Sequence, residues 1–123
     1  MKQRGFTLIE LLIVIGLISF IFAAAAPNFS RYSSLLNLNA SAKLIASDLR
    51  LTQNKALTQK ETLCYDPVKV KLPFGIKLTK TKPVYFSGSG NPAFGSSGTI
   101  IVENKLGRSK KIILSSAGRI RIE

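Results

Sequence analysis

Residues 5–26 read GFTLIELLIVIGLISFIFAAAA and form the long apolar segment of the chain. The run from Phe6 to Ala26 is almost entirely apolar, and as a helix it would span about 31 Å, the thickness of a bilayer core. Lys2 and Arg4 precede the run, which itself contains no Lys or Arg. The positive-inside rule therefore predicts a cytoplasmic N-terminus and an external location for everything after Pro27.

Glu10 is the one charged residue inside this apolar run. A carboxylate at membrane depth is costly, roughly 2.5–3.5 kcal/mol, so such a residue is a candidate for function. One alternative is a glutamate near the helix end that reaches the lipid headgroups. Another is an ordinary secretory signal peptide, because Ala23–Ala26 could serve as a small-residue cleavage site.

The ten residues GFTLIELLIV at positions 5–14 closely resemble the class III signal of type IV pilins and type II secretion pseudopilins. The resemblance implies that a prepilin peptidase cuts between Gly5 and Phe6 and then N-methylates Phe6. It also implies that Glu10 pairs with the Phe6 amine of a neighbouring subunit during assembly. The charges fit this role, since removing either partner would leave an unpaired buried charge. Pro27 should kink or locally melt the helix.

The rest of the chain changes from helical to strand-like periodicity near Lys60. Five apolar residues form one helical stripe from Leu38 to Ala56, which predicts an amphipathic helix over about 28–60. Beyond it, period-two alternation predicts a sheet over about 61–123, with a long loop at Ser87–Gly98. The prediction is an α+β, pilin-like fold with a leader at 1–5, a transmembrane assembly helix at 6–27 and a periplasmic domain at 28–123. The predicted strands are Val68–Leu72, Ile76–Leu78, Val84–Phe86, Thr99–Val102, Lys111–Leu114 and Ile120–Ile122.

Composition argues against an enzyme. The chain has no His and one Cys, so it lacks a histidine base, a histidine metal ligand and a multi-thiolate zinc site. We expect no catalytic residue, no metal and no cofactor. The single thiol, Cys64, is expected to be small and buried.

The C-terminal residues IILSSAGRIRI, at 112–122, resemble the closing strands of the FimT/GspH group of minor pilins and pseudopilins. In FimT-type proteins the Gly-Arg-x-Arg segment is associated with DNA binding during uptake for natural transformation, in competent cells. On a strand, Arg119 and Arg121 would share one face about 6.6 Å apart, close to the spacing of successive phosphates. Four more cations from the expected hairpin partner complete the predicted DNA-binding set: Lys105, Arg108, Lys110 and Lys111.

The charge of the domain supports a polyanionic partner. Residues 28–123 hold 16 Lys and Arg against 5 Asp and Glu, a net of +11. Such a domain should bind polyanions at low salt, here through the backbone of double-stranded DNA and with little sequence preference. The alternative is that these cations are solvated and protect a sheet edge from aggregation.

Three roles stay open, and the N-terminal segment is the same in all of them. The first is a FimT-like minor pilin that binds DNA. The second is a GspH-type minor pseudopilin of a type II secretion system, acting through contacts with other pilin or pseudopilin subunits. The third is a filament subunit whose basic face meets an anionic surface polymer. In each case the chain would cross the bacterial inner membrane once and then join a pilus or pseudopilus.

Overall fold

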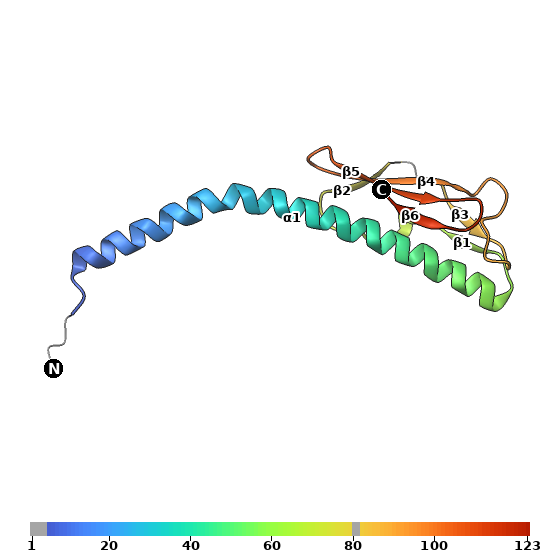
Figure 1. Ribbon diagram of the computed structural model, residues 1–123, viewed down its shortest axis with the longest axis horizontal. Helices are drawn as coiled ribbons and strands as arrows, with labels where there is room; N and C mark the ends of the chain where they lie inside the picture. The colour runs from blue at the N-terminus through green and yellow to red at the C-terminus, as the bar shows by residue number, and fades with distance from the viewer. Residues whose placement is uncertain (1–4, 80–81) are drawn as a thin grey trace. The chain divides into compact units, whose positions relative to one another are not determined.

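The computed structural model of the chain describes residues 5–79 and 82–123 (Figure 1). The predicted leader therefore lies outside the described residues, apart from Gly5. Contacts divide the chain into an N-terminal unit that ends at Ser33 and a globular unit that begins at Ser34. In chain order the elements are α1 (Leu8–Gln59), β1 (Leu63–Tyr65), the 3₁₀ helix η1 (Pro67–Lys69), β2 (Ile76–Thr79), β3 (Val84–Phe86), β4 (Gly98–Asn104), β5 (Ser109–Leu114) and β6 (Ile120–Ile122).

The N-terminal unit is the first part of helix α1. The helix begins at Leu8 and continues through Pro27 without a break, so of the two effects expected of the proline, a kink or local melting, the melting does not occur. Proline removes one hydrogen bond, and the four alanines before it are the strongest helix formers. Among the described residues, α1 is the one helix long and apolar enough to cross a membrane.

The globular unit contains two antiparallel sheets. The larger has the strand order β2-β4-β5-β6, and the smaller pairs β1 with β3. Asn104 closes the tight connection between β4 and β5, where its Oδ1 accepts hydrogen bonds from the backbone N–H groups of Leu106 and Arg108. Every strand pair is antiparallel, as the short alternating runs predict.

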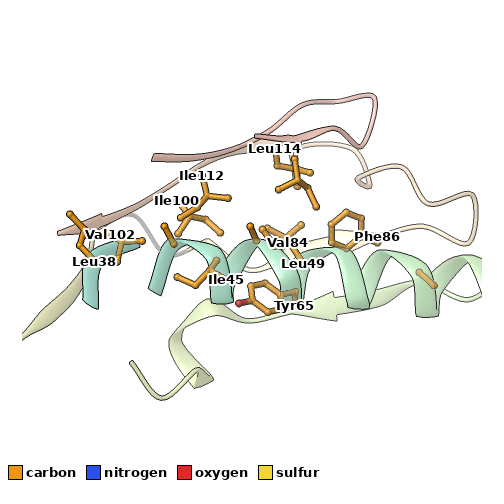
Figure 2. Close-up of a cluster of buried hydrophobic side chains, with 14 residues drawn as sticks. Leu38, Ile45, Leu49, Tyr65, Val84, Phe86, Ile100, Val102, Ile112 and Leu114 are labelled. Atoms are coloured by element: carbon orange, nitrogen blue, oxygen red, sulfur yellow. The ribbon is translucent and has the colours of Figure 1, made fainter. Parts of the chain in front are cut away.

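The core lies between the second half of α1 and the inner faces of the strands. The predicted helical stripe is confirmed, because all five of its residues are buried. Together with the sheets they form one apolar cluster, so the predicted α+β, pilin-like fold class is confirmed. Figure 2 shows the side chains that meet there, from α1 (Leu38, Ile45, Leu49), from β4 and β5 (Ile100, Val102, Ile112, Leu114) and from β1 and β3 (Tyr65, Val84, Phe86).

Two predictions for the segment after α1 are wrong. Val68–Leu72 is not a strand, because the Asp66 Oδ1 accepts a hydrogen bond from the Val68 N–H at 3.1 Å and caps η1. Proline at the first position of η1 further favours that turn. Cys64 is exposed rather than buried, because it lies on the outward face of β1, a strand that the sequence did not predict. The remaining predicted strands are confirmed as β2 to β6.

Tyr65 places a hydroxyl group inside the apolar core. Its side chain is 7% exposed, and its hydroxyl oxygen is buried with no hydrogen-bond partner among the described residues. Burial, together with the smaller effects of the Asp48 and Asp66 carboxylates, raises the pKa of Tyr65 from 10.0 to about 12.

A Tyr65→Phe variant should therefore be at least as stable as the wild type at neutral pH, gaining up to about 1–2 kcal/mol. The wild type should also lose stability between the unfolded pKa of 10.0 and the folded pKa of about 12. The reason is that the unfolded tyrosine ionises first while the folded one stays protonated. Urea unfolding from pH 8 to 12 would test this. An identical pH dependence in the two proteins would contradict it.

Candidate functional site

The first turn of α1 brings Thr7 and Glu10 together. The Glu10 N–H donates to the Thr7 Oγ1 at 3.4 Å, and the Leu11 N–H donates to the Thr7 carbonyl at 3.2 Å. Thr7 thus caps the helix, and Thr-x-x-Glu is the spacing of a capping box. The sequence analysis did not predict a role for Thr7, although the Thr-x-x-Glu spacing indicates a helix cap. The cap places the Glu10 carboxylate in the first helical turn, where the helix dipole favours negative charge.

The predicted cleavage site lies ahead of the helix. Gly5 and Phe6 are both exposed and non-helical. Exposed chain outside regular structure is the form in which proteases reach their substrates. The described geometry is therefore compatible with cleavage between these two residues.

The apolar residues that follow are exposed in the isolated subunit. Phe6 is 77% exposed, Phe20 75% and Phe22 71%. A continuous apolar surface of this extent is typical of a membrane span or a subunit contact. This surface is suited to burial by lipid or by other chains.

Arg119 and Arg121 lie side by side on the outward face of the larger sheet. Together with Ile113 and Ser115 they line a hollow of about 190 Å³. Ile120, between them in sequence, is 9% exposed and faces the core. The backbone positions of the two arginines are thus about 6.6 Å apart along the strand direction. This is the alternation that the sequence predicts for the closing strand.

Arg121 also forms an ion pair with Glu123. Its Nη2 lies 2.8 Å from the Glu123 Oε1, and the two side chains are 65% and 50% exposed. An ion pair in solvent contributes about 0–1 kcal/mol, so an arriving phosphate can replace the carboxylate at little cost.

Lys111 is the third cation on this face. Its backbone forms two hydrogen bonds with Glu123, both 2.8 Å long, and its side chain is exposed. Arg121 is opposite Ile113, two residues along β5 from Lys111, which makes the pair diagonal neighbours about 7–8 Å apart. We call Lys111, Arg119 and Arg121 the outer triplet.

The other three predicted cations lie elsewhere. Lys110 is half-buried, and because strands alternate its side chain faces away from that of Lys111. The Lys105 Nζ lies 3.8 Å from the centroid of the Phe74 ring, and Arg108 is exposed beside it in the β4–β5 connection. That connection is about 10 Å or more along the strands from Ile113. The six predicted cations therefore do not form a single cluster.

Gln53 of α1 holds the turn that precedes Arg119. Its Nε2 donates to the carbonyl oxygens of Gly118 at 3.0 Å and Gly90 at 2.8 Å. A Cβ on Gly118 would lie 2.7 Å from this Nε2, and Gly118 has a φ of +79°. Glycine is therefore required there for both space and conformation. No local sequence pattern predicts this contact, because Gln53 and Gly118 are 65 positions apart.

Comparison with known proteins supports the resemblance of the N-terminal segment to a class III signal. Residues 1–26 match the prokaryotic N-terminal methylation motif. A search of the solved structures gave no match. The motif implies processing by a prepilin peptidase and assembly with other pilin-type subunits. Together with the apolar helix, the motif indicates that the protein is located in the inner membrane or the pilus. In its N-terminal segment the chain thus resembles type IV pilins and pseudopilins, whose class III signal it carries, and the match covers residues 1–26.

Proposed function

We propose that the chain is a FimT-like minor pilin of a type IV pilus machine that binds DNA during uptake for natural transformation. The observation that carries this proposal is the position of Arg119 and Arg121, side by side over Ile113 on an exposed sheet face. Guanidinium groups bind phosphate oxygens bidentately and stay charged at every physiological pH. Two of them at about 6.6 Å can contact successive phosphates of one strand.

Of the six cations predicted to contact DNA, the proposal keeps the three of the outer triplet. Lys111 extends the row formed by the two arginines across β5 and β6. The domain charge of +11 supplies long-range attraction for any polyanion, and the triplet would supply the local contacts. Contacts to phosphate carry no sequence information, so binding to double-stranded DNA should be tolerant of sequence.

Maturation and assembly follow from the same proposal. Residues 1–5 are removed by the prepilin peptidase, and Phe6 becomes the methylated first residue. Residues 6–27 cross the inner membrane, and residues 28–123 lie in the periplasm. The Glu10 carboxylate then pairs with the Phe6 amine of a neighbouring subunit as the chain enters a filament.

A GspH-type pseudopilin of a type II secretion system is the alternative. The observation that favours it is the Arg121–Glu123 pair, which neutralises one of the two arginines. In that case the sheet face would be a solvated surface and the subunit would act through protein contacts.

A salt titration of DNA binding separates the two functions. Full-length subunit in non-ionic detergent would be titrated with double-stranded DNA at several salt concentrations, alongside an Arg119→Gln/Arg121→Gln variant. We expect weaker binding and a log–log salt slope shallower by about 1–2 units, because phosphate contacts release counterions.

A matched variant controls for the loss of charge. Lys43→Gln/Lys55→Gln removes the same charge from exposed positions on α1. It should change the salt slope less than the arginine variant does. Equal slopes for the wild type and the arginine variant would contradict DNA contact and favour the pseudopilin.

A further inference from the structure

A groove of about 650 Å³ opens between the two sheets, on the opposite side of β5 from the hollow that holds the arginines. Its walls come from β3 and from the start of β4. Buried side chains of Val84, Ile100 and Leu114 form its apolar base. Lys82 lies at its rim and is exposed. The groove thus combines an apolar interior with a cation at its edge.

An exposed aromatic residue lies beside this groove. Phe94 lines the groove, and its side chain is fully exposed. It is the second residue of a turn in which the Ser96 N–H donates to the Ala93 carbonyl at 2.9 Å. Gly95, the third residue, has a φ of +80°, as a type II turn requires.

The same turn is attached to strand β3. The Ala93 N–H donates to the Tyr85 carbonyl at 2.7 Å, and Pro92 bridges to Phe86. Tyr85 also lines the groove and is 44% exposed. These bonds hold the backbone of the turn against β3, and the Phe94 side chain projects from it into solvent. An exposed phenyl group held in this way adds nothing to the core, so its position favours contact with a flat apolar partner.

The base of the groove faces the core, and its rim at Thr99 reaches the outward face of the larger sheet, on which the arginines lie. Thr99, a wall of the groove, is paired with Ile113, and Ile113 is paired with Arg121. Two strand spacings, about 10 Å, separate Thr99 from Arg121. A short piece of one nucleic-acid strand can span that distance with its phosphates at the arginines.

We propose that the groove beside Phe94 binds an unpaired base of single-stranded DNA whose phosphates contact Arg119 and Arg121. This inference rests on the proposed DNA-binding function and extends it from phosphate contact to base stacking. Bases stack on exposed aromatic rings with little regard to sequence. The bases of a duplex are already stacked, so duplex DNA would engage the arginines alone. The subunit should therefore prefer single strands to duplexes.

The test uses full-length subunit in non-ionic detergent with three labelled probes of equal length. These are oligothymidylate, an abasic strand with the same phosphates, and a duplex. Phe94→Ala should weaken binding of oligothymidylate by roughly tenfold or more, the loss expected for one stacked base. Binding of the abasic strand and the duplex should not change, and the salt slope should stay the same.

Phe74→Ala is the matched control. Phe74 is 90% exposed and contacts Lys105 near the β4–β5 connection, away from the groove. We expect this variant to bind all three probes like the wild type. An equal loss in the two phenylalanine variants would overturn the base site.

The remaining outcomes separate this inference from the proposed function. If Phe94→Ala binds oligothymidylate normally while Arg119→Gln/Arg121→Gln weakens every probe, the base site is overturned and the DNA-binding function stands. If Phe94→Ala leaves DNA binding intact but prevents incorporation into filaments, the groove is a subunit contact and the base site is again overturned. If the wild type binds none of the probes, both proposals fail.

Discussion

Replacing Phe86 with alanine is expected to lower the free energy of unfolding of the globular unit by about 3–5 kcal/mol. Phe86 is the largest fully buried side chain described in the protein, with 0% of its surface exposed (Figure 2). It joins β3 to the cluster formed by α1 and the larger sheet. Its truncation would leave a cavity where three elements meet. Because small domains are marginally stable, such a loss is comparable with the whole free energy of folding.

Urea unfolding of the full-length subunit in non-ionic detergent, followed by near-ultraviolet circular dichroism, would measure this loss. The midpoint should fall while the dependence on urea stays similar. Phe94→Ala removes the same atoms from a fully exposed position and should change stability by less than about 0.5 kcal/mol. Equal losses in the two variants would show that Phe86 is not a core residue.

A Glu10→Leu variant is expected to insert into the membrane but to be almost absent from filaments. Leucine continues the apolar run, so insertion should be easier than in the wild type. The Phe6 amine of the neighbouring subunit would then lose its carboxylate partner. Breaking one side of a buried ion pair costs roughly 3–5 kcal/mol, enough for a loss of about 100-fold or more in incorporation.

The ratio of subunit in sheared filaments to subunit in the membrane measures this effect. Leu12→Ile, two residues later in the same apolar run, is the matched control and should be incorporated normally. Thr7→Ala removes the Oγ1 acceptor of the helix cap but keeps Glu10, so this variant distinguishes the effect of the cap from the effect of the carboxylate. Normal incorporation of Glu10→Leu would contradict the proposed pairing with the Phe6 amine.

The parts of the fold that follow local sequence rules were predictable. Three such parts are the apolar run, the helical stripe of the globular unit and the later strands. Each shows its pattern within one continuous segment of the sequence. Val68–Leu72 shows the limit of that signal. Its alternation fits a strand, but Asp66 and Pro67 impose a local 3₁₀ turn on the same residues. The hydrogen bond that the Asp66 side chain accepts therefore determined the local structure, although the five residues alternate as a strand would.

The candidate site was predictable only in part, because its geometry depends on strand register. Lys110 and Lys111 are adjacent in sequence, yet they face opposite sides of β5, so only Lys111 joins the arginines. The contact of Gln53 with Gly118 and the position of Phe94 beside the groove both depend on long-range packing. No local pattern encodes them.

The mass of the mature protein tests most directly whether the chain is a processed pilin-like subunit. Intact-mass spectrometry of the full-length protein, purified from the membranes of cells that contain a prepilin peptidase, would measure it. We predict the loss of residues 1–5 together with the gain of one methyl group, located on Phe6 by fragmentation. Protein from cells without the peptidase should keep residues 1–5. An unprocessed chain in cells with an active peptidase, or cleavage after Ala26 instead, would contradict the assignment.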